Sequence, residues 1–187
     1  ITRLIGPDQS DLRASFVSWD NLSTQEVFSF NASLPLTLNK FWDAFFNLSG
    51  NYTDNQADYG NGAVVNVQNY GYTIFQQHTF KLPKAFKGEI SGYYSGPGVW
   101  GGVFKYEANW SLNLGLQRTF FKKQLNVRVT ANNIFNRQMW EGSSTFNGLT
   151  SSGIGRMDMH YISLSLNYTF GNQNVKSRKR KSGLEAE

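Results

Sequence analysis

Few side chains in this sequence are suited to catalysis or to metal binding. The 187 residues contain two histidines, His78 and His160, and no cysteine. The histidines are far apart in the sequence and lack an HExxH-like spacing, so no zinc site is indicated. No nucleophile elbow is present, and Asp158 near His160 is the closest approach to an acid–base pair. We expect no enzyme activity, no metal and no cofactor.

The segment DNQADYGNG (54–62) resembles the start of a calcium-binding loop. Val65 occupies the twelfth position, where an EF-hand needs a glutamate. The sequence therefore excludes an EF-hand and leaves open a weaker calcium site in a loop.

Asparagines within N-x-S/T triplets recur along the chain, at Asn21, Asn31, Asn47, Asn51, Asn109 and Asn167. In a secreted protein such triplets can accept glycans. Four of them (Asn31, Asn47, Asn109 and Asn167) fall in runs where polar and apolar residues alternate. We interpret these four as the polar lining of strands.

Basic residues are concentrated near the C-terminus, at Lys176, Arg178, Lys179, Arg180 and Lys181. With Glu185 and Glu187 they give residues 172–187 a charge of +3, which leaves +2 of the total +5 for the rest of the chain. The cluster could be read as a nucleic-acid patch. As the tail of a membrane protein it is more simply a solvated segment, for which we expect contact with anionic head groups or a periplasmic partner, and no nucleic acid.

The composition favours a transmembrane β-barrel. Aromatic residues make up 16% of the chain and charged residues only 17%, against roughly 25% in soluble proteins. The mean hydropathy is nevertheless −0.44, and no apolar run is long enough for a transmembrane helix. A barrel strand needs no continuous apolar run, because only every second residue contacts lipid and the others face a polar interior.

The last strand predicted, within 157–171, shows the alternation most clearly. One face carries apolar side chains, which we identify as the barrel-assembly signal: Ile162, Leu164, Leu166, Tyr168 and Phe170. The residues between them are serine, asparagine and threonine. Successive side chains of a strand point to opposite faces, so the strand is apolar on one face and polar on the other.

Similar alternation predicts further strands within 28–34, 41–52, 89–94, 104–116 and 125–131, and a run at 65–82 whose faces the mixed pattern does not assign. In the run 104–116, alternation places Lys105 and Glu107 on the polar face with Asn109. The run exceeds an ordinary soluble strand of about 5–6 residues and suffices for a tilted membrane strand of about 9–11. Breaks near 36–40, 82–87 and 120–124 are short, whereas those near 54–64, 95–103 and 137–156 are longer. Short periplasmic turns and long external loops are typical of outer-membrane barrels.

One segment resembles TonB-dependent receptors, and another resembles outer-membrane barrels in general. ANNIFNRQMW (131–140) is similar to the asparagine-rich segment of the penultimate strand of these receptors, and the strand ending Tyr168-Thr169-Phe170 resembles the C-terminal assembly signal of outer-membrane barrels. TFKLPKAFKGEISGYYSGP (79–97) and the tail KSRKRKSGLEAE resemble an outer-membrane β-barrel family with basic, acidic-ended extensions. The likeness covers nearly the whole chain.

This resemblance implies a receptor for energised uptake of a scarce nutrient, with a plugged barrel of about 22 strands. Its implied partners are outer-membrane lipid, the barrel-assembly machinery and a TonB-type energy-coupling protein, which would act on a plug domain absent from this chain. Polar-face residues such as Arg128, Lys105 and Glu107 would line the lumen. No ligand-binding residue can be carried over from the family.

The predicted fold class is therefore all-β, an antiparallel transmembrane β-barrel sector of about 7–8 strands, part of a 22-strand barrel in the bacterial outer membrane. Residues 1–21 are expected to be a partial strand and an extracellular loop, because Ile1–Ile5 looks like a strand that begins outside the chain. Residues 22–171 form the barrel strands and loops, and residues 172–187 a basic periplasmic tail.

Two alternatives remain. An eighth strand could close a small non-transporting barrel that serves as a structural anchor or adhesin. A more distant alternative is a soluble carbohydrate-binding sandwich that uses Trp100, Trp110 and Trp140.

Overall fold

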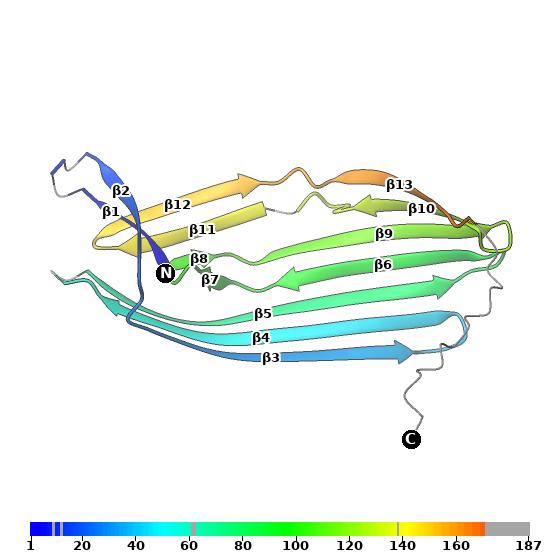
Figure 1. Cartoon of the computed structure of the whole chain (residues 1–187), viewed down its shortest axis with the longest axis horizontal. Coiled ribbons are helices and arrows are strands. Elements are labelled where there is room, and N and C mark those ends of the chain that lie inside the picture. The colour runs from blue at the N-terminus through cyan, green and yellow to red at the C-terminus, as the bar shows by residue number, and fades with distance from the viewer. Residues whose placement is uncertain (9, 12, 61–62, 138, 171–187) are drawn as a thin grey trace, which may run out of the picture.

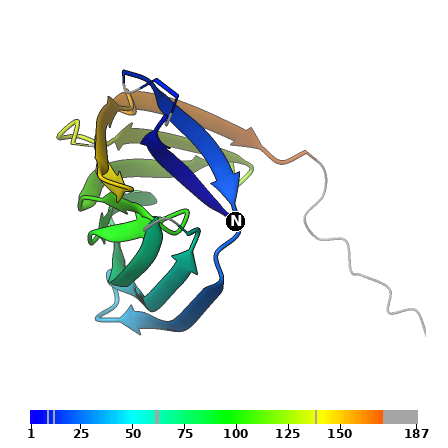
Figure 2. The ribbon, with the colours of Figure 1, turned by 90° about the vertical axis from the view of Figure 1, so that its left-hand side faces the viewer.

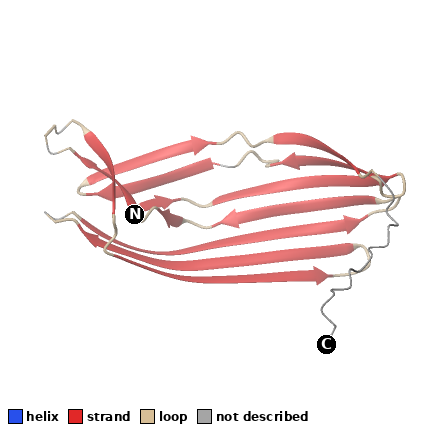
Figure 3. Ribbon diagram, viewed as in Figure 1, coloured by secondary structure: helices blue, strands red, loops and turns tan. Residues whose placement is uncertain are grey.

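Strands, turns and irregular connections make up the whole of the described structure. The computed structural model describes residues 1–8, 10–11, 13–60, 63–137 and 139–170. They form three antiparallel sheets of seven, four and two strands, shown in Figure 1 and Figure 3. None of these residues belongs to a helix long and apolar enough to cross a membrane.

The largest sheet contains the seven strands that alternation predicted, including the run at 65–82. They are β3 (Thr24–Thr37), β4 (Trp42–Asp58), β5 (Val64–Lys81), β6 (Phe86–Ser95), β9 (Asn109–Phe120), β10 (Leu125–Asn132) and β13 (Tyr161–Tyr168). Their spatial order follows the chain, β3-β4-β5-β6-β9-β10-β13. Each strand therefore pairs with its neighbours in the main sheet by simple up-and-down connections, and the prediction of an antiparallel all-β fold is confirmed.

The register gives this sheet one apolar and one polar face. On one face Phe28 pairs with Tyr52, and Leu164 with Val129. On the other, serine and asparagine recur opposite one another, as in the pairs Ser29↔Asn51, Ser33↔Asn47, Ser95↔Asn109 and Asn126↔Asn167. A one-residue slip would exchange the faces, so the sequence pattern strongly specifies this register.

The short turns all lie at one end of the sheet, the right-hand end in Figure 1. The turns after β5 and β9 contain residues with positive φ, Lys84 and Ala85 in one and Phe121, Lys122 and Lys123 in the other. At the opposite end, which we call the outer end, the longer connections form additional strands.

The four-stranded outer sheet prolongs the main sheet at this end. It comprises β7 (Gly98–Trp100), β8 (Phe104–Tyr106), β11 (Met139–Phe146) and β12 (Leu149–Arg156) in the order β12-β11-β8-β7. The longer break expected near 137–156 is instead mostly the β11–β12 hairpin. Its turn, Asn147-Gly148, has positive φ at both residues, as a tight hairpin turn requires.

A separate hairpin lies at the N-terminus. β1 (Thr2–Pro7) pairs with β2 (Ser15–Asp20) and with no strand of the main sheet. The strand expected at Ile1–Ile5 is thus part of a hairpin, and half of the region expected to be a loop is strand. Figure 2 shows this hairpin across the open side of the curved sheet, at its outer end.

Candidate functional site

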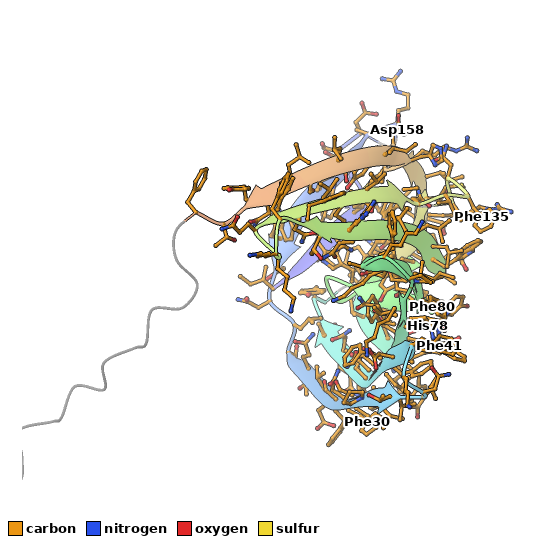
Figure 4. The ribbon with its side chains drawn as sticks, turned by 90° about the vertical axis from the view of Figure 1, so that its right-hand side faces the viewer. Phe30, Phe41, His78, Phe80, Phe135 and Asp158 are labelled. Atoms are coloured by element: carbon orange, nitrogen blue, oxygen red, sulfur yellow. The ribbon has the colours of Figure 1, made fainter. Side chains whose placement is uncertain are left out.

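The convex face of the main sheet carries its apolar side chains. Figure 4, viewed from the short-turn end, shows Phe30, Phe41, Phe80 and Phe135 directed away from the curved sheet. This apolar face is not covered by other parts of the described structure. Four of its leucines are at least 41% exposed, namely Leu34, Leu114, Leu164 and Leu166. Such a wide exposed apolar surface is unusual for a soluble protein and normal for a lipid-facing barrel wall.

Aromatic side chains border this apolar surface at both ends. At the short-turn end, Trp42 stacks on Phe80 with ring centroids 5.7 Å apart, and its indole Nε1–H donates to His78 Nδ1 at 3.2 Å. At the outer end, Tyr52 lies against Tyr70 at 4.9 Å, and Tyr72 against Tyr94 at 5.9 Å. Leucine, isoleucine and valine predominate between these two bands, as in the aromatic girdles of membrane barrels.

The distance between the two bands matches a bilayer. On β5, Phe80 follows Tyr70 by ten positions, which is about 33 Å along a strand. At a strand tilt of 35–45° this corresponds to about 25 Å across the membrane, the height of the apolar band of outer-membrane barrels. The strand length and the spacing of the aromatic bands therefore both fit strands that cross the membrane between these bands.

The concave face is mostly polar, apart from aromatic residues such as the Phe45–Phe75 pair, and it contains an ion pair whose partners lie on either side of a strand. Arg128 Nη2 on β10 lies 2.8 Å from Glu89 Oε1 on β6, over the intervening strand β9. Gly115 of β9 leaves the space for this contact, since a Cβ there would lie 3.3 Å from Glu89 Cβ and 3.8 Å from Arg128 Nη2. Other side chains on this face bond locally, for example Asn47 Nδ2 to Ser33 Oγ at 2.8 Å.

The asparagine-rich segment 131–140 ends β10 in a tight turn. Asn133 has φ of 48° and is 2% exposed. Its backbone N–H donates to Asn113 Oδ1 at 2.9 Å, and its side-chain Oδ1 accepts from the Arg137 backbone N–H at 3.1 Å. His160 Nδ1 lies 2.9 Å from the Asn133 carbonyl oxygen, which can only accept, so Nδ1 donates. The segment thus joins β9, β10 and the start of β13.

A small hydrophobic core closes the outer end of the concave side. It consists of Leu4, Ala57, Val65, Val103 and Phe146, contributed by β1, β4, β5, the β7–β8 turn and β11. Tyr59 packs against Phe146, and its hydroxyl donates to the Asn21 carbonyl oxygen at 3.0 Å. Burial raises the pKa of the Tyr59 phenol above its ordinary value. This cluster, called the mouth cluster below, holds the N-terminal hairpin in place.

A cavity of about 600 Å³ lies where the main sheet meets the outer sheet. It is lined by Tyr93, Ser95, Trp100, Tyr106, Glu107, Asn109, Met139, Trp140, Glu141 and Met157. This volume is within the range of small-molecule sites. The long run expected at 104–116 is interrupted here, because β8 ends at Tyr106 and β9 begins at Asn109. Tyr106 and Asn109 line the same cavity although strict alternation would place them on opposite faces.

The tryptophans of the carbohydrate-binding alternative are not all together. Trp100 and Trp140 line this cavity. Trp110 instead packs against Phe135, which Figure 4 places on the convex face, with ring centroids 5.8 Å apart. The main sheet, moreover, is prolonged by the outer sheet, and the two do not face each other as in a sandwich.

Four residues of the predicted assembly signal, Ile162, Leu164, Leu166 and Tyr168, lie on the edge strand β13, and Phe170 follows it. Ile162, Leu164 and Leu166 are 77%, 64% and 66% exposed, and Phe170 packs edge-on against Tyr168 at 4.6 Å. The basic residues Lys176, Arg178, Lys179, Arg180 and Lys181 lie outside the described residues.

The two histidines lie in different surroundings, and within the described ranges no group of three or more potential ligands could hold a metal. The calcium-like segment is partly strand, and Asp54 Oδ2 accepts from Gln56 and Gln68. Of the expected lumen residues, Arg128 forms the concave-face ion pair and Glu107 lines the cavity, whereas Lys105 lies exposed in the outer sheet.

Comparison with known proteins gives one match. A model of the outer membrane protein beta-barrel family matches residues 5–168. No curated protein and no solved structure matches the chain. The matched range includes the N-terminal hairpin from Ile5, both larger sheets and the last strand.

Proposed function

The chain belongs to the outer membrane protein β-barrel family, and from this premise we propose that it is part of the barrel wall of a TonB-dependent receptor. In this role the convex face contacts lipid and the concave face lines a large lumen. The bacterial outer membrane is the location that the family implies. The barrel would take up a scarce nutrient and would have no catalytic activity.

The observation that carries the proposal is the pair of open sheet edges. Among the described strands, β3 pairs only with β4, and β13 pairs only with β10. An unpaired backbone N–H or C=O in hydrocarbon costs several kcal/mol, so a membrane barrel must pair both edges. Additional strands that join β3 to β13 would complete a wide barrel, and a receptor with about 22 strands supplies them.

The contents of the concave side also support a wide barrel. The interior of an eight-stranded barrel is just wide enough to be filled by its own side chains. Here a complete hairpin, β1–β2, is packed across the open side at the outer end, with Leu4 in the mouth cluster. A lumen that accommodates a hairpin favours the receptor over the small anchor or adhesin.

Energised uptake requires partners on the periplasmic side. A plug domain outside this chain would connect the barrel to a TonB-type energy-coupling protein. The short-turn end of the sheet would face the periplasm, as in outer-membrane barrels generally. The tail 172–187 would then be periplasmic, and Lys176, Arg178, Lys179, Arg180 and Lys181 could contact anionic lipid or a periplasmic protein.

The size of the native protein tests the barrel proposal. An antibody raised against residues 172–187 is used on fractionated membranes of the native source. We expect an outer-membrane band far larger than 21.2 kDa, the mass of this chain. A heat-modifiable band near that mass would mean a small barrel and would contradict the proposal.

Growth tests address transport separately. A strain lacking the gene and a strain lacking the energy-coupling protein are compared on limiting iron, cobalamin and carbon sources. We expect a shared defect on at least one source, restored by the wild-type gene. A strain without any defect that the coupling mutant shares would contradict energised uptake while leaving the barrel itself untouched.

A further inference from the structure

The cavity between the main and outer sheets, called the seam cavity below, has a lining with an uneven chemical character. Its aromatic residues are Tyr93, Trp100, Tyr106 and Trp140, and its ionisable acids are Glu107 and Glu141. Among the residues that the structure describes, no lysine, arginine or histidine contributes to the lining. A cavity with aromatic faces and only negative charges is complementary to an organic cation.

Three aromatic rings at this site are held by glycines of neighbouring strands. Trp140 lies over β12, where a Cβ at Gly153 would approach its ring to 3.2 Å and one at Gly155 to 3.6 Å. Tyr106 covers Gly98 in the same way, and Phe104 covers Gly142. A side chain at Gly98 or Gly142 would clash with the ring that covers it, and one at Gly153 would require a small shift of Trp140, so these glycines leave the room that the rings occupy.

The stacking of Trp140 adds to this rigidity. Its ring lies almost parallel to that of Phe104, with centroids 5.2 Å apart and an interplanar angle of 13°. Trp140 is nevertheless 42% exposed, and Trp100 is 57% exposed. Rigid aromatic side chains that remain open to solvent are the residues that most often anchor a ligand.

The acidic side chains are available to a ligand. Across the described part of the chain, neither Glu107 nor Glu141 takes part in an ion pair, and both residues are exposed. Asn109 also lines the cavity, but its Oδ1 is buried in the wall, without a hydrogen-bond partner among the described residues. Two exposed carboxylates beside aromatic rings suit a cation that carries N–H donors.

We propose that the seam cavity binds a small organic ammonium ion, in which an apolar body packs against Trp100 and Trp140 and the charged nitrogen lies near Glu107 and Glu141. The role of this ion as cargo rests on the proposed uptake function, whereas its binding does not. The site would bind the ligand at the outer end of the barrel, before transport begins.

Benzylamine, protonated at pH 7, and benzyl alcohol form a suitable pair of probes because they have similar shapes and differ in charge. Binding to the full-length protein in detergent is followed by tryptophan fluorescence excited at 295 nm. We expect benzylamine to bind about tenfold more tightly than benzyl alcohol. Equal affinity for both probes, or no saturable binding of benzylamine, would overturn the proposal.

Variants locate the binding site. The double substitution Glu107→Gln, Glu141→Gln keeps the shape of the cavity, and we expect it to weaken benzylamine binding by roughly fivefold or more. Glu26→Gln removes an exposed carboxylate on β3, outside the cavity, and should leave the affinity unchanged. Because the control removes one carboxylate and the double substitution two, a loss of affinity with Glu26→Gln of about half that of the double variant or more would show that benzylamine responds to net charge alone, which contradicts the proposal.

The aromatic contribution is tested by Trp100→Leu, which replaces the more exposed tryptophan and leaves the packed Trp140 in place. We expect weaker binding of both probes with an unchanged heat-modifiable band. Unaltered affinity would exclude Trp100 from the site. If binding fails in all experiments while energised uptake persists, the inference about the cavity falls and the proposed function stands.

Discussion

Gly115 shows how a single residue can determine which side chains meet on the concave face. It separates Glu89 from Arg128 within the sheet, and its lack of a side chain lets the carboxylate and the guanidinium approach to 2.8 Å. The side chains are 24% and 41% exposed, so solvent weakens the attraction and the pair contributes little to stability. Its effect is to hold two lumen-facing side chains in fixed positions.

The contribution of this pair can be measured with a double-mutant cycle of Glu89→Gln and Arg128→Gln. We expect a coupling energy of about 0.5 kcal/mol, measured by urea unfolding in detergent. The coupling should disappear in a Gly115→Leu background, because the leucine side chain occupies the path of the ion pair. Gly50→Leu is the control, since an added Cβ there meets only the Gly71 carbonyl oxygen at 3.7 Å. A coupling that persists with leucine at position 115 would contradict this geometry.

At the scale of elements, the N-terminal hairpin is held by burial within the protein, whereas the last strand is suited to contact with lipid. β1 is held by burial, since Leu4 is 4% exposed within the mouth cluster. β13 is suited to lipid, since its apolar side chains remain exposed along one face. Apolar residues on these two elements therefore respond differently to substitution.

Truncation of Leu4 should release the hairpin. Leu→Ala substitutions in packed cores cost about 2–5 kcal/mol, and we expect Leu4→Ala to increase hydrogen exchange in β1 and β2 while the main sheet stays protected. Val17→Ala is the matched control on the same hairpin, because Val17 is 56% exposed. Equal hydrogen exchange in the two variants would contradict the packing of Leu4 in the mouth cluster.

A charge on the convex face of β13 should impair assembly. A lysine in the middle of a barrel's lipid face costs about 2–4 kcal/mol, so we expect Leu164→Lys to reduce the heat-modifiable protein in the outer membrane severalfold. Asn167→Lys places the same charge on the concave face, opposite the uncharged Asn126, and should assemble nearly normally. Equal losses in the two variants would contradict the orientation of β13.

Strict alternation in the sequence predicts the main sheet well. The faces of β3, β9, β10 and β13 follow directly from their residue order, because one side contacts lipid along the whole strand. β5 has a mixed pattern for two physical reasons: Val65 is buried in the mouth cluster on its outer part, and Phe75, on the same face, packs against Phe45 of β4. At the outer part the concave side is apolar because a hairpin covers it.

The strands and contacts at the outer end are harder to predict from the sequence than the main sheet. The interruption at residues 107–108 changes the phase of alternation, so Tyr106 joins Asn109 at the seam cavity. The Asn147-Gly148 turn was a usable signal for the β11–β12 hairpin, although the short, polar strands around it obscured the pattern. The contact between β1 and the mouth cluster joins distant parts of the chain and leaves no local trace in the sequence.

At the scale of the whole molecule, the three sheets form a curved wall with a covered outer end. Seven strands supply a convex apolar face, bordered by two aromatic bands that are about 25 Å apart across the membrane. The polar concave face, the N-terminal hairpin and the seam cavity lie within the region that a complete barrel would enclose. The account depends on one property, namely that lipid contacts the convex face and water the concave face.

Site-directed spin labelling of a cysteine-free protein tests this property most directly, and the 187 residues contribute no cysteine to be replaced. Single cysteines are placed at successive positions from 110 to 117 of β9, labelled in outer membranes, and probed with oxygen and a water-soluble nickel complex. The account predicts that even-numbered positions favour oxygen and odd-numbered positions favour nickel, with a period of two. The opposite phase, or nickel access on both faces, would contradict the assignment of the convex face to lipid.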